Sequence, residues 1–151
     1  MRRSRICGAS LGDRAEGDLY RFQVILLDSI GELASIYRFA SVVFVGGSLV
    51  PHGGHNIIEP AAFAKPIVVG PHTGNFAQIV KDFAAAGAHV RIASTDPGTQ
   101  VQTLSSEMVR LLTDKAAARS IGGRGREILE RNRGATGRIL IAMKQVIVDQ
   151  N

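Results

Sequence analysis

Two Gly-Gly pairs, placed between an apolar run and the expected start of a helix, constrain the fold of this chain most strongly. The apolar run covers residues 41–45 (SVVFV) and ends at the first pair (46–47), and the second pair (53–54) shortly precedes Asn56. An apolar run of this length is typical of a buried strand, and Asn is common at a helix start. The segment therefore predicts one strand–turn–helix step of a parallel α/β sheet.

The same alternation continues on both sides of this segment. Further buried strands are predicted at residues 23–28, 66–70 and 88–92, and helices at 29–38, 56–63, 75–86, 97–113, 114–132 and 135–149. The helix at 114–132 is expected to break near Gly122 and Gly123, because glycine destabilises a helix interior. Residues 1–22 show no period. We therefore expect an irregular stretch at 1–22, followed at 23–151 by a Rossmann-like α/β domain with a parallel sheet.

The bulk composition fits one α/β domain and excludes several other classes. The 151 residues are enough for one buried core, and a hydrophobic share of 45% with 5% aromatic residues suits a core of Val, Ile, Leu and Ala. The single cysteine, Cys7, excludes an internal disulfide. No apolar run approaches the roughly 18 residues that a membrane-spanning helix needs.

The net charge of +5 does not by itself indicate nucleic-acid binding. Single-stranded nucleic acid is usually bound by aromatic side chains set among basic ones, and here the aromatic residues are not interleaved with the arginines. We therefore expect no nucleic-acid partner and favour a solvated helical face, or one beside anionic lipid headgroups. Much of the positive excess lies near the two chain ends, in Arg2, Arg3, Arg5, Arg119, Arg124, Arg126, Arg131, Arg133 and Arg138.

The segment from 46 to 60 also carries the chemistry expected of a nucleotide-sugar site. Glycine pairs leave backbone N–H groups accessible, and a helix beginning at Asn56 directs free N–H groups at a phosphate. Glu59 lies one turn further, where its carboxylate can accept hydrogen bonds from sugar hydroxyls. The structural alternative is a capping box between Asn56 and Glu59, worth about 1 kcal/mol. A simple cap does not require two Gly-Gly pairs, so we favour ligand binding.

Other catalytic and metal-binding patterns are not found in the sequence. His52 and His55 are three residues apart, but neither has a recognised zinc-ligand spacing, which favours a hydrogen-bonding role. Ser29 and Glu32 have the capping-box spacing, and only the expected position of Glu32 at the same sheet edge connects it with a ligand. No P-loop and no G-x-G-x-x-G between a strand and a helix are present, which disfavours a dinucleotide oxidoreductase.

Several short motifs follow one another in a specific order. They are residues 28–33 (DSIGEL) with Tyr37, 45–49 (VGGSL), 53–56 (GGHN) with Glu59 and Pro60, 70–72 (GPH) with Asn75 and Phe76, and 132–135 (NRGA). Together they resemble the C-terminal domain of the 3-deoxy-D-manno-octulosonic acid (Kdo) transferases, from about Val24 to Ile147. The resemblance implies a GT-B glycosyltransferase of lipopolysaccharide synthesis. Such an enzyme transfers Kdo from CMP-Kdo to a lipid A precursor at the cytoplasmic face of the inner membrane.

The resemblance also implies which positions contact the donor, because the family binds CMP in its C-terminal domain. The family's general base, acceptor groove and membrane anchor lie in an N-terminal domain that this sequence does not match. The first strands of the family's donor domain are not matched either. We therefore expect no catalytic residue, no metal and no cofactor, and weak CMP binding without turnover by a marginally stable chain. The implied donor contacts are Ile30, Gly31, Glu32, Gly47, Ser48, Asn56, Ile57, Ile58 and Glu59.

Two alternatives stay open at this point. In the first alternative, the chain is a non-catalytic nucleotide-binding remnant. In the second, it belongs to another GT-B enzyme that uses a UDP-sugar. The first alternative rests on the observation that no general base can be identified in the sequence of 151 residues. The second differs from a Kdo transferase in the nucleotide, so protection against heat by CMP or by UDP distinguishes them.

Overall fold

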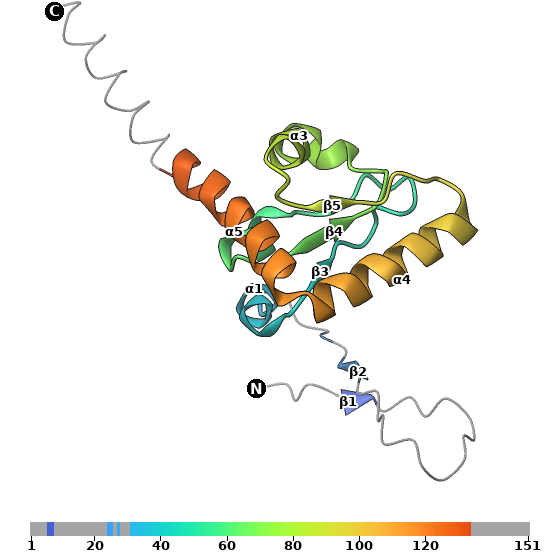
Figure 1. Ribbon diagram of the computed structural model, residues 1–151, viewed down its shortest axis with the longest axis horizontal. Helices are drawn as coiled ribbons and strands as arrows, with labels where there is room; N and C mark the ends of the chain where they lie inside the picture. The colour runs from blue at the N-terminus through green and yellow to red at the C-terminus, as the bar shows by residue number, and fades with distance from the viewer. Residues whose placement is uncertain (1–5, 8–23, 26, 28–30, 134–151) are drawn as a thin grey trace, which may run out of the picture. The chain divides into compact units, whose positions relative to one another are not determined.

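The computed structural model describes residues 6–7, 24–25, 27 and 31–133 of the chain (Figure 1). These residues belong to two compact units, one within residues 1–36 and the other within 37–151. The helix predicted at 135–149 lies outside the described residues and stays a prediction.

The first unit contains a two-stranded antiparallel pair and a short helix. Strand β1 (Ile6–Cys7) pairs with β2 (Val24–Ile25), and helix α1 spans Leu33–Ile36. The prediction of a parallel strand at 23–28 is therefore wrong in its direction, because an apolar run indicates a strand but not its partner. Strand β1 lies within 1–22, where the sequence shows no period.

The second unit contains a three-stranded parallel sheet. Its strands are β3 (Val43–Phe44), β4 (Ile67–Val69) and β5 (Val90–Arg91), which lie side by side in the order β3-β4-β5 (Figure 1). Each strand lies within an apolar run for which a strand was predicted. Parallel neighbours that follow one another in the sequence need a crossover connection between them. The predicted α/β class with a parallel sheet is confirmed.

Helices connect these strands and complete the second unit. They are η1 (Tyr37–Phe39), α2 (Ile58–Ala62), η2 (Gly74–Phe76), α3 (Ala77–Ala85), α4 (Pro97–Thr113) and α5 (Lys115–Asn132). The Asp96 side chain caps α4 by accepting a 2.8 Å hydrogen bond from the backbone N–H of Thr99. Asp114 caps α5 in the same way, through the N–H groups of Ala116 and Ala117. These local caps define both helix starts: α4 begins at the predicted residue 97, and α5 begins at 115, one residue after the predicted start.

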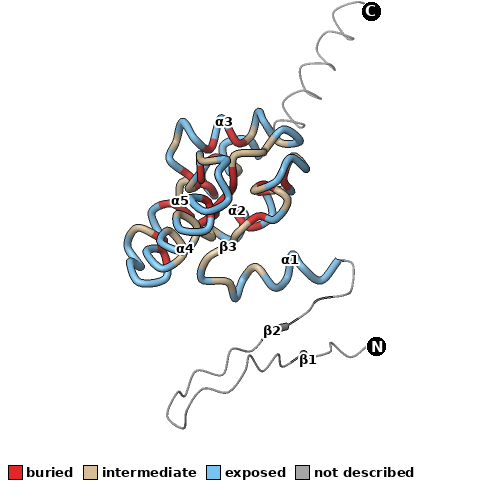
Figure 2. The backbone as a smooth tube through the Cα atoms, turned by 90° about the vertical axis from the view of Figure 1, so that its right-hand side faces the viewer, coloured by how far each residue is buried: buried red, intermediate tan, exposed pale blue. Residues whose placement is uncertain are grey.

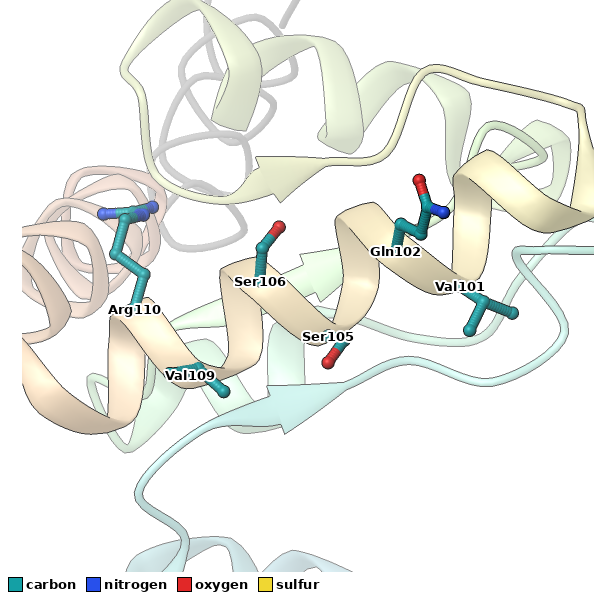
Figure 3. Close-up of a pocket in the computed structure, with 6 residues that line it drawn as sticks. All are labelled: Val101, Gln102, Ser105, Ser106, Val109 and Arg110. Carbon is teal, nitrogen blue, oxygen red and sulfur yellow. The ribbon is translucent and has the colours of Figure 1, made fainter.

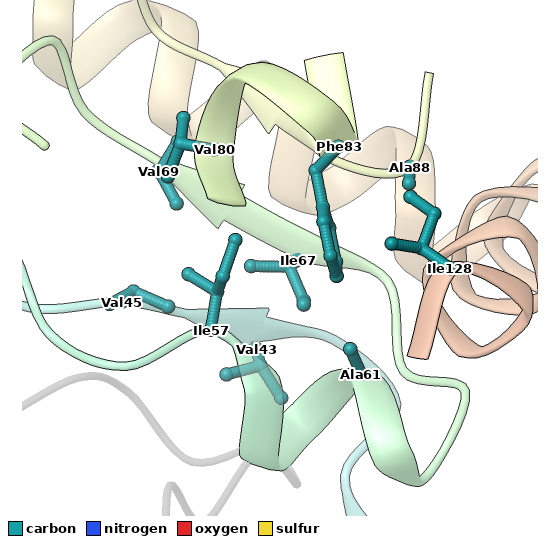
Figure 4. Packing of buried hydrophobic residues seen from close by; sticks show 10 residues of the cluster. All are labelled: Val43, Val45, Ile57, Ala61, Ile67, Val69, Val80, Phe83, Ala88 and Ile128. Carbon is teal, nitrogen blue, oxygen red and sulfur yellow. The ribbon is translucent and has the colours of Figure 1, made fainter. Parts of the chain in front are cut away.

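Side chains of β4 alternate between two apolar cores on opposite faces of the sheet. Ile67 and Val69 belong to a cluster with Ala61 of α2 and Phe83 of α3 (Figure 4). Val68 belongs to a second cluster, with residues of α4 and the first half of α5. Figure 2 shows the buried segments gathered in the interior of this unit. Helices therefore cover both faces, as in a doubly wound sheet.

Helix α5 is continuous, so the predicted break near Gly122 and Gly123 is wrong. Gly122 is buried against the chain that follows α2, and a Cβ at this position would overlap the carbonyl group of Ala64. Glycine permits this close approach of the two backbones. Packing of α5 against α2 thus offsets the low helix propensity of glycine, which was the basis of the prediction.

Candidate functional site

Ser48 joins the carboxyl ends of β3 and β4. Its hydroxyl donates a 2.5 Å hydrogen bond to the Val45 carbonyl and accepts a 2.8 Å bond from the N–H of Gly70. The Ser48 carbonyl accepts a further 2.9 Å bond from the N–H of His72. The Ser48 side chain is fully buried, so this residue, predicted as a donor contact, holds the loop from the inside.

The loop between β3 and α2 is closed on itself by its glycines. The N–H of Gly54 donates a 3.1 Å hydrogen bond to the Gly47 carbonyl, and the φ angles of Gly47, Gly53 and Gly54 are 71°, 84° and 73°. Only glycine adopts such angles readily. The Asn75 side-chain amide donates to the carbonyls of His52, at 3.1 Å, and Gly54, at 3.4 Å. The conformation of the loop therefore accounts for the second Gly-Gly pair without a ligand.

Helix α2 begins at Ile58 and not at the predicted Asn56; its N-cap position is Ile57, which makes no side-chain cap hydrogen bond. The Asn56 side-chain oxygen accepts a 2.9 Å hydrogen bond from the N–H of Ile58, and its amide nitrogen lies 3.5 Å from Glu59 Oε1. Ile57 belongs to the core, whereas Ile58 and Glu59 are exposed. The Asn56 side chain thus bonds to the backbone just before the helix, without the predicted capping box, and the Glu59 carboxylate stays at the surface.

Tyr37 in η1 belongs to the surroundings of Glu59. Burial raises the pKa of Tyr37 above its usual range, and the negative charge of Glu59 raises this pKa further. The Tyr37 side chain also packs against the core cluster that contains Ile57 and Ala61. The sequence placed Tyr37 only within a resemblance motif, because no spacing rule connects residues so far apart in the chain.

The remaining predicted donor contacts lie in the first part of the chain. Ile30 is outside the described residues. Gly31 and Glu32 are exposed, and the Glu32 carbonyl accepts backbone hydrogen bonds from Ser35, at 3.0 Å, and Ile36, at 3.3 Å. Gly31 and Glu32 belong to the first unit, so their participation in one site with Glu59 stays a prediction.

A hollow of about 520 Å³ adjoins the same loop at the carboxyl ends of β4 and β5. Its walls come from the β3–α2 loop, the β4–α3 loop, α3 and the end of β5. The charged residues that line it are Lys81 and Arg91, and the Arg91 guanidinium donates a 3.0 Å hydrogen bond to the Pro71 carbonyl. Converging groups from several segments are the usual form of a ligand pocket.

A second hollow, of about 670 Å³, is an open ledge along α4 (Figure 3). The described residues that line it come from this one helix: Val101, Ser105 and Val109 along one side, and Gln102, Ser106 and Arg110 along the neighbouring side. Among the described residues, no group from another segment converges on them, which favours the hollow at β4 and β5 over this ledge as a ligand site.

The described histidines do not form a metal centre. His52 and His55 are exposed, and the described ranges hold no group of three or more His, Cys, Asp or Glu side chains arranged around a metal position. His89 is buried, and neither of its ring nitrogens has a hydrogen-bond partner in this part of the chain. Burial lowers the pKa of His89, and the positive charge of Arg91 lowers it further.

The parallel sheet, its covered faces and the loops at its carboxyl edge define a Rossmann-like α/β domain. A solved structure, the C-terminal CMP-Kdo binding domain of WaaA from Acinetobacter baumannii, matches the chain with a TM-score of 0.63 and 35% sequence identity. The match covers 72% of this chain and 54% of that one. The class is therefore the C-terminal domain of a GT-B glycosyltransferase.

Curated relatives identify the family. The chain is 41% identical over 122 residues to the 3-deoxy-D-manno-octulosonic acid transferase of Haemophilus influenzae, and 36% identical over 121 residues to that of Bordetella pertussis. These matches cover 81% and 80% of the chain but 27% of each relative, so the chain spans about a quarter of their length. The sequence matches no protein-family model. The chain belongs to the Kdo transferase family and corresponds to its C-terminal domain.

Proposed function

We propose that this chain binds the CMP-Kdo donor of a Kdo transferase at the carboxyl edge of its parallel sheet. The observation that carries the proposal is the 35% identity to a solved domain described as CMP-Kdo binding. The surroundings of Glu59 support it, because an exposed carboxylate follows a glycine loop at the sheet edge where nucleotides bind in α/β folds.

The proposed donor contacts differ in the group that each presents. Glu59 presents a carboxylate, which accepts hydrogen bonds from ribose hydroxyls, and Asn56 orients it. Gly47 presents backbone without a Cβ to the phosphate. Ser48 and Ile57 are buried and act by holding the loop. Further contacts are proposed on the family resemblance alone, from the exposed Ile58 and from Ile30, Gly31 and Glu32.

The reaction proposed for the whole protein is transfer of Kdo from CMP-Kdo to a lipid A precursor in lipopolysaccharide synthesis. The curated relatives, which are Kdo transferases, support it. Because the chain spans 27% of their length, we propose that these 151 residues bind the donor without completing the transfer. In this proposal, the acceptor binds to the part of the Kdo transferase that corresponds to the unmatched length of the relatives.

Contact with the cytoplasmic face of the inner membrane is proposed as peripheral. In the described ranges, no helix is both long and apolar enough to cross a bilayer. The proposal rests on the acceptor, since a lipid A precursor is held in a membrane.

Glu59→Gln tests the proposed donor site. The substitution keeps the shape of the side chain and removes its charge, and hydrogen bonds to charged groups are worth roughly 1.5–3 kcal/mol. We therefore expect the affinity for CMP to fall about tenfold or more. Isothermal titration calorimetry measures this affinity. Glu127→Gln is the matched control, because Glu127 is an exposed glutamate on α5, outside the proposed site.

Three results would contradict the proposal in distinct ways. Equal CMP affinity of the Glu59→Gln and Glu127→Gln variants would remove Glu59 from the site. Stronger thermal protection by UDP than by CMP would indicate a UDP-sugar enzyme. If a Kdo-transferase-deficient strain that expresses only these 151 residues were to grow, the chain would complete the transfer by itself.

A further inference from the structure

We propose that the hollow at the carboxyl ends of β4 and β5 binds a phosphate monoester, at a position separate from the proposed CMP site. Its volume of about 520 Å³ lies within the usual range for small-molecule pockets. Neither Asn56 nor Glu59 is among its lining residues. The hollow therefore offers a second set of contacts, which the nucleotide interpretation does not use.

The charged side chains on the walls of this hollow are positive. Lys81 comes from α3 and Arg91 from the end of β5, and no Asp or Glu is among the described residues that line the hollow. Within the described residues, neither side chain forms an ion pair with a carboxylate. Two cations that face one concave site produce a positive potential there, which attracts an anion.

The Arg91 guanidinium is already held in position by the loop after β4. It donates a 3.0 Å hydrogen bond to the Pro71 carbonyl, which engages one nitrogen of a group with five N–H donors. The remaining donors of the fork match the spacing of phosphate oxygens. Thr73 and His72, which line the neighbouring wall, add a hydroxyl and an imidazole as further hydrogen-bonding groups.

The α3 wall of the hollow is apolar beside the Lys81 ammonium group. Ala77, Val80 and Ala84 line it, at a spacing that puts them on one face of the helix. Apolar surface next to a cation suits a phosphate that is attached to a sugar ring or a hydrocarbon group. A soluble sugar phosphate and a lipid phosphate headgroup share this chemistry, and the experiment distinguishes them.

Amide NMR of the full 151-residue chain, titrated with glucose 1-phosphate, locates the binding. We expect saturable shifts of the Thr73 and Gly74 amides that persist at saturating CMP. Lys81→Met is expected to weaken this binding at least fivefold. Lys115→Met is the matched control, because Lys115 is an exposed lysine at the start of α5 that does not line the hollow. Both lysines are exposed, so the spectrum of each variant away from the site should stay that of the folded chain.

Vesicles of phosphatidylcholine, with and without phosphatidic acid, supply the lipid arm. The ligand is a lipid phosphate if the Thr73 and Gly74 signals are lost only with vesicles that contain phosphatidic acid and do not shift with glucose 1-phosphate. Saturation by glucose 1-phosphate alone assigns a soluble phosphate monoester. The proposal is overturned if neither probe affects these amides, if Lys81→Met and Lys115→Met bind equally, or if CMP displaces the phosphate. A Glu59→Gln variant that binds CMP weakly should still show the phosphate-dependent shifts of the Thr73 and Gly74 amides. The phosphate proposal and the CMP proposal can therefore fail independently of each other.

Discussion

The hydroxyl of Ser48 accepts a 2.8 Å hydrogen bond from the N–H of Gly70 and so connects the carboxyl ends of two neighbouring strands. The same residues lie so close together that a Cβ at position 70 would overlap the Ser48 carbonyl group. The structure of the sheet edge next to the proposed donor site therefore depends on the Ser48 hydroxyl and on the absence of a Cβ at Gly70.

Gly70→Ala is expected to destabilise the chain. The added methyl group meets backbone atoms of Ser48, which cannot rotate away, and overpacking of this kind costs about 1–3 kcal/mol or more. Urea unfolding measures the loss. Gly74→Ala is the control, because a Cβ at Gly74 has no neighbour within 4 Å. Equal stability of the two variants would show that the edge can move to accept the methyl group.

Ser48→Ala removes the hydroxyl from the same junction. The N–H of Gly70 and the carbonyl of Val45 then lose their partner in a buried position, at a cost of about 1–3 kcal/mol. The midpoint of thermal unfolding should fall accordingly. Ser106→Ala serves as the comparison, since that exposed hydroxyl donates to the Thr103 carbonyl within α4 itself. A midpoint for Ser48→Ala as high as that of Ser106→Ala would argue against the role of the junction.

Gly122 and Gly123 should respond to alanine in opposite directions. Alanine at 122 collides with the Ala64 carbonyl and should destabilise the chain by about 1–3 kcal/mol. Alanine at 123 has no neighbour within 4 Å, so the better helix propensity should stabilise by up to about 1 kcal/mol. Denaturant midpoints of the two variants check both signs. A loss of stability in both would mean that α5 is held differently at Gly123.

Stability should fall on acidification because of His89. Its pKa is lowered in the folded chain by burial and by Arg91, so the unfolded chain binds the proton more readily. The contribution of neutral His89 is complete above the unfolded pKa of about 6.5 and is lost as the pH decreases toward the folded value. Urea midpoints between neutral pH and pH 5 measure the slope.

The matched variants for this slope are His89→Leu and His52→Gln. His89→Leu should flatten the decrease, because it removes the titrating group. His52→Gln should keep it, because His52 is exposed. An unchanged slope in His89→Leu would assign the pH dependence to other groups.

Elements with local signals were predictable from the sequence. Helix α4 begins and ends at the predicted residues because Asp96 and Asp114 mark the starts of two successive helices with caps that involve only near neighbours. The burial of β4 also followed from composition, since an unbroken apolar run suits a strand covered on both faces.

Features that depend on distant partners were not predictable. The antiparallel pairing of Val24–Ile25 requires Ile6–Cys7, and the continuity of α5 at Gly122 requires the chain after α2. At the site, Glu59 is exposed, and its role as a donor contact stays a prediction. The burial of Ser48 did not follow from its spacing, because Gly70 and the next strand hold its hydroxyl.

The two-sided burial of β4 has a consequence for how the second unit opens. Ile67, Val68 and Val69 are all 0% exposed, and β4 pairs with a strand on each side. Water reaches the amide protons of this strand only when both apolar cores separate together. Exchange with deuterium should therefore be slowest at β4 and should report the cooperative opening of the whole unit, whereas the surface loops exchange through local fluctuations.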